Sequence, residues 1–188
     1  MTDVTRGENR GLQRRTVLRN GLLAGLGVAA VSISSTAIEG TAQAFSYQTG
    51  WKWCSKCRGL FYGPQQSASH CPAGGTHDST GSWPYTMFYD DPSSGGILQQ
   101  QNWSWCGKCT GLFYGPKQSY SICPAGGPHD GSGSYNYSVA YNTGQGQPNW
   151  NWCLQCQGLF YGPQQSVSHC PAGGTHDGSR SYNYSVTY

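Results

Sequence analysis

One pattern of cysteine and histidine occurs three times in this chain, and it constrains the fold more than any other feature. Each copy has the spacing C-x2-C-x13-C-x5-H. Thiolate and imidazole are ligands that zinc prefers, and four of them complete a structural site. We therefore predict three metal sites, formed by Cys54, Cys57, Cys71 and His77; by Cys106, Cys109, Cys123 and His129; and by Cys153, Cys156, Cys170 and His176.

Disulfide bonding is the main alternative for these cysteines. Pairing within a repeat leaves one thiol over each time, and the total of nine is odd. The histidine at constant spacing is explained by a metal and not by disulfides. We favour Zn2+, about three ions per chain, and keep disulfides or mixed states, then iron or another soft metal, as alternatives.

Catalytic interpretations of the same residues are weaker. A C-x-x-C redox pair is expected beside a βαβ unit, which this Gly-rich chain does not predict. Catalytic zinc keeps an open coordination position, whereas four protein ligands close the site. We find no Ser/His/Asp, paired-carboxylate or phosphate-loop arrangement, so we predict a protein that is not an enzyme.

The repeats divide the chain after residue 44. We expect repeat 1 at 45–89, a turn-rich linker at 90–102, repeat 2 at 103–141, a Gly/Gln-rich linker at 142–149 and repeat 3 at 150–188. Repeats of this length form either separate beads on short linkers or an assembly packed about a pseudo-threefold axis. Both arrangements remain open from the sequence.

The sequence pattern of each repeat predicts three strands and no helix. Alternating tryptophans lead into C-x-x-C, a Leu-Phe-Tyr strand follows, and an aromatic strand such as 134–141 ends the unit. We expect positive φ two residues after the second cysteine, at Gly59, Gly111 and Gly158. This first part resembles the zinc knuckle of zinc-ribbon proteins. The fold class is therefore small all-β and metal-stapled, with three tandem zinc-ribbon-like repeats and no helix after residue 44.

Other polar residues near the sites have simpler interpretations. Repeat 2 has Ile122 where the other repeats have His70 and His169, so we interpret these histidines as surface residues. The aspartate after each ligand histidine either accepts the imidazole N–H or satisfies the loop backbone. The aspartates in question are Asp78, Asp130 and Asp177.

Aromatic residues replace the scarce aliphatic ones after residue 44. We assign the Leu-Phe-Tyr strands to the core, together with Trp53, Trp105 and Trp152. The first tryptophans of the Trp-x-Trp pairs are our candidate binding residues at the surface, because indole rings stack on sugars and on protein partners. These are Trp51, Trp103 and Trp150.

Residues 1–44 have the features of an export signal. Arg14 and Arg15 precede an apolar run from Gly21 to Ile33, and Ala42-Gln43-Ala44 offers small residues for cleavage. The run has 13 residues, fewer than the ~20 that span a bilayer. The segment resembles a twin-arginine (Tat) signal peptide. That resemblance implies an exported, periplasmic or extracellular protein that contacts a membrane only during export.

Charge argues against nucleic acid as a partner. The net charge of +3 comes mostly from arginines of the leader, and no basic stripe follows. The leading hypothesis is an exported, non-enzymatic binding protein whose partner is a polysaccharide or another cell-surface molecule, with cell-wall or environmental glycan as first choice. An envelope zinc-buffering protein is the alternative, and an enzyme of unidentified type ranks third. Ligand identity and oligomeric state remain open.

Overall fold

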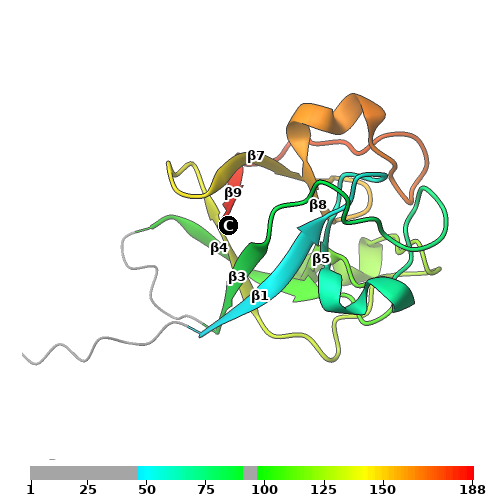
Figure 1. Cartoon of the computed structure of the whole chain (residues 1–188), viewed down its shortest axis with the longest axis horizontal. Coiled ribbons are helices and arrows are strands. Elements are labelled where there is room, and N and C mark those ends of the chain that lie inside the picture. The colour runs from blue at the N-terminus through cyan, green and yellow to red at the C-terminus, as the bar shows by residue number, and fades with distance from the viewer. Residues whose placement is uncertain (1–45, 91–96) are drawn as a thin grey trace, which may run out of the picture. The chain divides into compact units, whose positions relative to one another are not determined.

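The computed structural model describes residues 46–90 and 97–188. The predicted export signal and residues 91–96 of the first linker lie outside this part. The described chain is mostly antiparallel β-structure, which confirms the small all-β fold (Figure 1). The strands are β1 (Ser46–Trp53), β2 (Leu60–Tyr62), β3 (Tyr85–Tyr89), β4 (Gln99–Trp105), β5 (Leu112–Tyr114), β6 (Tyr137–Tyr141), β7 (Gln147–Trp152), β8 (Leu159–Tyr161) and β9 (Tyr184–Val186).

Each repeat consists of a hairpin and a third strand beside it. In repeat 1, β1 pairs with β2 so that Trp51 lies opposite Tyr62, and β3 pairs with the other edge of β1. The β1–β3 register shifts just before Trp51, where Gly50 has φ 89°, and the equivalent residues Asn102 and Asn149 have φ 68° and 70°. Glycine and asparagine adopt this left-handed region at the least cost, so the sequence permits a β-bulge at this position in every repeat.

The repeats pair with one another in two closed circles. β3 pairs with β6 and β6 with β9, and a bridge between Thr86 and Thr187 joins β9 back to β3. The hairpin strands form a second circle through the bridges Phe61–Gly111, Phe113–Gly158 and Gly59–Phe160. The described repeats are therefore packed about a pseudo-threefold axis and are not separate beads.

All three repeats contribute to one hydrophobic core. Each supplies a tryptophan of the first strand, the leucine of Leu-Phe-Tyr, a tyrosine of the third strand, and a methionine or valine two residues later. These residues are Trp51, Leu60, Tyr85, Met87, Trp103, Leu112, Tyr137, Val139, Trp150, Leu159, Tyr184 and Val186. Each repeat buries only a small cluster of its own, formed by its cysteines and the phenylalanine of Leu-Phe-Tyr. The larger apolar core is shared, so each repeat depends on the other two for its burial.

The expected surface position of the first tryptophan in each Trp-x-Trp pair was wrong. Residues two apart on a strand share a face, so both tryptophans of a repeat point toward the same side of the sheet. The first tryptophan of each pair lies in the core and is 0% exposed, as found for Trp51, Trp103 and Trp150. These side chains therefore have no face available to an external ligand. The second of each pair is only partly buried at the edge of the core, as seen for Trp53, Trp105 and Trp152.

Partly buried glutamine side chains join neighbouring repeats at the core. Gln48 Oε1 accepts hydrogen bonds from Trp51 Nε1 of its own repeat (3.0 Å) and from the hydroxyl of Tyr137 in repeat 2 (2.6 Å). Gln147 Oε1 accepts likewise from Trp150 Nε1 (3.2 Å) and from the Tyr85 hydroxyl (2.5 Å). Tyr184 donates to Gln100 in the same way, but Trp103 Nε1 has no hydrogen-bond partner among the described residues. Each bond satisfies polar atoms that burial would otherwise leave unpaired.

No α-helix occurs in residues 46–90 and 97–188, but a six-residue 3-10 helix follows each Leu-Phe-Tyr strand and was not predicted. The proline at the start of each segment fits a first helical turn, which needs no N–H from that residue. The segments are η1 (Gly63–Ala68), η2 (Gly115–Tyr120) and η3 (Gly162–Val167). No helix in the described part has the length and apolar character to cross a bilayer.

The buried tyrosines predict a loss of stability in alkali. Burial raises the pKa of Tyr85 to about 12, and it raises the pKa of Tyr137 and Tyr184. An unfolded tyrosine ionises near pH ~10, so deprotonation favours the unfolded chain above that pH. We expect the free energy of unfolding, measured in urea, to fall as the pH rises from about 10 through about 12.

Matched variants separate this effect from general alkaline damage. Tyr137→Phe removes one buried ionisable group and should weaken the dependence on alkaline pH. Tyr120→Phe, at a side chain that is 80% exposed, should not change it. If every tyrosine ionised near pH ~10 while the fold stayed intact, the buried hydroxyls would not be the cause of the fall in stability.

Candidate metal centres

The first two ligands of each site lie in the turn of the hairpin. In repeat 1 the turn is closed by hydrogen bonds from Cys54 N to Gly59 O and from Arg58 N to Cys54 O, both 2.9 Å. The left-handed residue is Arg58 (φ 71°), and its counterparts are Thr110 and Gln157. Our prediction of positive φ at Gly59, Gly111 and Gly158 was therefore wrong by one residue. Side chains other than glycine hold a conformation here that costs ~1–3 kcal/mol.

The third ligand and the histidine lie on a tight loop. Cys71 N donates to Gly75 O (2.8 Å), and Gly74 N donates to Cys71 O (2.9 Å). Gly74 and Gly75 have φ 97° and 64°, yet a Cβ on either would meet nothing within 4 Å. The backbone conformation, and not crowding, thus requires glycine at both positions.

A buried serine positions the ligand histidine, and the sequence reasoning did not identify it. Ser69 Oγ donates to Gln66 O (2.6 Å) and accepts from His77 N (2.8 Å). The same pair of bonds forms at the equivalent serines, Ser121 and Ser168. Its identity in all three copies was the signal available in the sequence.

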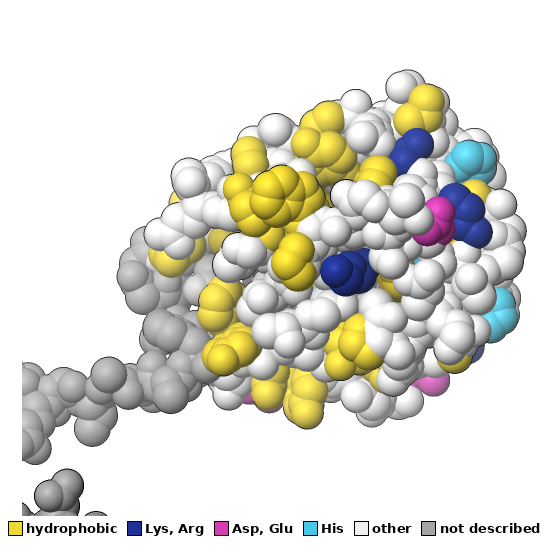
Figure 2. All heavy atoms as spheres, in the orientation of Figure 1, with side chains coloured by type: hydrophobic (Ala, Val, Ile, Leu, Met, Phe, Trp, Pro, Cys, Tyr) yellow, Lys and Arg dark blue, Asp and Glu magenta, His cyan; other side chains and the backbone are white. Residues whose placement is uncertain are grey.

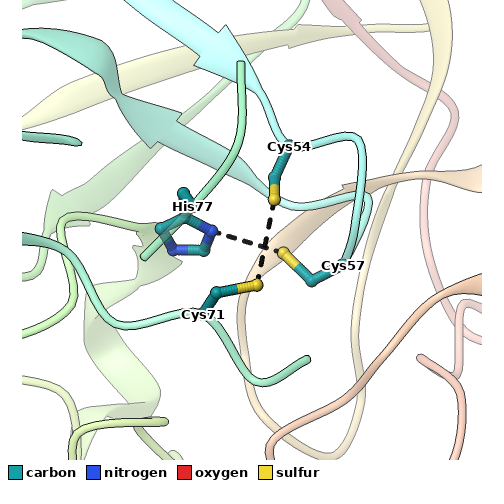
Figure 3. Close-up of side chains that lie close together, drawn as sticks. All are labelled: Cys54, Cys57, Cys71 and His77. Atoms are coloured by element: carbon teal, nitrogen blue, oxygen red, sulfur yellow. Dashed lines mark hydrogen bonds between the residues drawn. The ribbon is translucent and has the colours of Figure 1, made fainter. Parts of the chain in front are cut away.

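The four predicted ligands of each repeat come together, as Figure 3 shows for repeat 1. Their donor atoms lie within 4.8 Å of one another in all three sites. Cys54 Sγ is 3.9 Å from Cys71 Sγ, and Cys57 Sγ is 3.5 Å from His77 Nδ1. Tetrahedral zinc, with bonds of ~2.3 Å to sulfur and ~2.0 Å to nitrogen, separates two sulfurs by ~3.8 Å and sulfur from nitrogen by ~3.5 Å. The donors therefore fit one zinc ion per site, or three per chain.

The same distances exclude disulfide bonds within this structure. The sulfurs of the first and third cysteines lie 3.8–3.9 Å apart in the three sites, against ~2.05 Å for a disulfide. All nine cysteines are buried and free. The fold brings the thiols to metal-ligand spacing and not to bonding distance.

The electrostatics of the sites favour a bound cation. Hydrogen bonds from the side chains of neighbouring cysteines lower the pKa of the first thiol in each site, that is Cys54, Cys106 and Cys153. Asp78 N also points at Cys54 Sγ (3.4 Å). Burial, together with the neighbouring thiols, raises the pKa of Cys57. Three buried thiolates therefore become compatible with folding only when a metal dication compensates their charge.

The imidazole faces the thiols through Nδ1 and an aromatic ring covers its plane. His77 and Phe61 stack with ring centroids 4.6 Å apart, and the other two sites repeat this contact. His77 Nε2 is buried without a hydrogen-bond partner among the described residues. The Asp78 carboxylate instead accepts from Ser55 Oγ and Thr80 N. Of the two roles proposed for this aspartate, the structure shows loop stabilisation.

The extra histidines lie outside the metal sites. His70 and His169 are exposed, and each places Nδ1 near a backbone carbonyl of another repeat: Lys108 O at 3.0 Å and Lys56 O at 3.2 Å, respectively. They contact the neighbouring hairpin turn and do not ligate. This agrees with their interpretation as surface residues.

The three sites surround one small cavity near the pseudo-threefold axis. Its volume is about 40 Å³, and its walls include ligands from every repeat, among them Cys57, Cys109 and Cys156. A cavity of this size holds one or two waters at most. The sites are thus packed against one another, and each supports the hairpin turn of the next.

No family model, curated protein or solved structure matches this chain. Four buried protein ligands per site leave no open coordination position, which is the arrangement of structural zinc. The three repeats are zinc-binding modules.

Replacing one ligand tests the assignment against a matched histidine. His77→Ala removes a ligand from repeat 1 only, so we expect native mass spectrometry to find two zinc ions in place of three and the thermal midpoint to fall. The His70→Ala variant, changed at an exposed histidine that is not a ligand, should keep all three zinc ions. Equal zinc loading in the two variants would contradict the ligand set.

Proposed function

We propose that this protein is an exported, non-enzymatic binding protein whose zinc sites hold the fold and whose surface binds glycan. The observation that carries the proposal is a set of three exposed aromatic side chains at equivalent positions. Trp83, Tyr135 and Tyr182 are 55%, 49% and 53% exposed. They replace the buried Trp51, Trp103 and Trp150 as the candidate ligand platform.

Each of these rings is held in place by an aromatic residue of the adjacent repeat. Tyr135 stacks on Tyr89 with centroids 4.1 Å apart and planes at 16°, and Tyr182 stacks on Tyr141 at 4.7 Å and 20°. Trp83 meets Tyr188 edge-on at 4.7 Å. A ring fixed in this way loses little freedom when a ligand stacks on it, and that favours binding.

The surface chemistry suits a neutral, hydroxyl-rich partner. Figure 2 shows scattered charged side chains, with hydrophobic patches among neutral polar atoms. Aromatic faces beside amides and hydroxyls bind the apolar faces and the hydroxyls of sugar rings. A chain without a basic stripe is a poor match for nucleic acid. Three similar platforms allow weak contacts to add along a polymer.

Export supports the same role. The twin-arginine-like leader would deliver a folded, metal-loaded protein to the periplasm or the exterior, where polysaccharide is abundant. Zinc buffering fits the site geometry less well, because all twelve ligand residues are buried. Exchange of metal from such sites would require the fold to open.

Retention on insoluble polysaccharides tests the proposal. The zinc-loaded, exported protein is mixed with peptidoglycan, chitin or cellulose, and bound and free fractions are measured. We expect retention on at least one of them, with elution by its soluble oligosaccharide and little effect of salt. Recovery of the protein in the unbound fraction from all three would contradict glycan binding.

A further inference from the structure

A groove on repeat 2 combines the exposed tyrosine with neutral polar side chains. Its volume is about 430 Å³, within the ~300–1,000 Å³ of ligand sites. It lies where β4, η2 and the segment before β6 meet. The lining residues are Asn102, Ser104, Gly115, Pro116, Gln118, Ser134, Tyr135 and Asn136.

The groove presents one aromatic ring and two fixed amides. Tyr89 covers one face of Tyr135 but does not line the groove, so the groove lies on another side of that ring. Asn136 Oδ1 accepts from Asn102 N (2.7 Å), and Gln118 Oε1 accepts from Gly131 N (3.3 Å). Both carboxamides are therefore held through their oxygens. Within residues 46–90 and 97–188 their NH2 groups make no hydrogen bond, so these donors can serve a ligand.

No charged side chain lines the groove. A phosphate or carboxylate ligand would lack the cation that usually pairs with it. An aromatic ring beside two amides and several hydroxyls instead matches a neutral pyranose, which has one apolar face and a rim of hydroxyls.

The residue at position 104 sets the depth of the groove, and it differs among the repeats. Ser104 lies against Gly115, where an added Cβ would be 2.8 Å from Ser104 Oγ. In repeat 1 the longer Lys52 lies over the equivalent Gly63, where a Cβ would be 2.6 Å from Lys52 Cγ. In repeat 3 the amide of Asn151 covers Gly162 in the same way. Serine is the smallest of the three and leaves the most space.

The aromatic side of the groove differs among the repeats as well. Repeat 3 keeps a tyrosine followed by asparagine, Tyr182 and Asn183, whereas repeat 1 has Trp83 followed by Pro84. Repeat 1 therefore lacks both the open space and the second amide. The combination of small residue, ring and two amides belongs to repeat 2.

We propose that the groove between Ser104 and Tyr135 is a saccharide subsite that takes one pyranose ring of a neutral polysaccharide. The ring stacks on Tyr135, while the Asn136 and Gln118 amides donate to its hydroxyls. Ser104 provides the space that the ring occupies. This inference rests on the proposed glycan-binding function and assigns it to one place.

The test exchanges residues that the chain already uses. Ser104→Lys introduces the lysine of repeat 1, where the same hairpin folds around it, and fills the groove. Tyr135→Ala removes the stacking ring at a half-exposed position. On the polysaccharide that retains the wild type, among peptidoglycan, chitin and cellulose, we expect each variant to bind about tenfold more weakly, the factor that one aromatic stacking contact contributes.

Controls separate this result from damage to the fold. Both variants should keep three zinc ions, as the wild type does, and Tyr120→Ala, at an exposed tyrosine outside the groove, should bind as the wild type. If the Ser104→Lys and Tyr135→Ala variants are both retained as strongly as the wild type, the groove assignment alone is overturned. Retention of the wild type by none of the three polymers would overturn the groove together with the proposed function.

Discussion

Three thiolates and an imidazole packed together in a protein interior require a positive charge among them. In each repeat the fold buries all four ligands and raises the pKa of the central thiol, Cys57 in repeat 1, so the metal-free cluster resists full ionisation. A zinc ion supplies the compensating charge and joins the hairpin turn to the Cys-Pro-Ala-Gly-Gly loop. Units of about 39 residues with few aliphatic side chains need such a staple, because the apolar area that they bury is small.

The zinc sites alone do not hold the whole fold together. The buried tryptophan of each repeat lies in a core shared by all three repeats. Gln48 and Gln147 link two of these tryptophans to a tyrosine of another repeat. Main-chain bridges close the two circles of strands around the axis. Metal sites thus hold each repeat internally, while aromatic packing and hydrogen bonds hold the repeats together. The outer aromatics, Trp83, Tyr135 and Tyr182, lie about half exposed at the surface.

Local patterns in the sequence predicted the metal ligands and most of the strands, because ligand spacing and alternation are visible within one repeat. Features that depend on other repeats were not predictable in this way. Tyr137 finds its partner Gln48 at a separation of 89 residues, and the full burial of Trp51 follows from the packing of three repeats. Trp51 was expected at the surface and Trp53 in the core, but the two-residue period of a strand places both on one face. The left-handed residue in the turn proved to be Arg58, since hydrogen bonding of the C-x-x-C turn outweighs the backbone preference of a single residue.

The most direct test of the zinc-stapled fold is a joint count of metal and thiols in protein purified from cells without added metal or chelator. We predict three zinc ions per chain by native mass spectrometry. We also predict nine titratable thiols once the protein is denatured with chelator present. Little or no zinc, with cysteines already oxidised to disulfides in a folded protein, would contradict the claim that metal holds these repeats together.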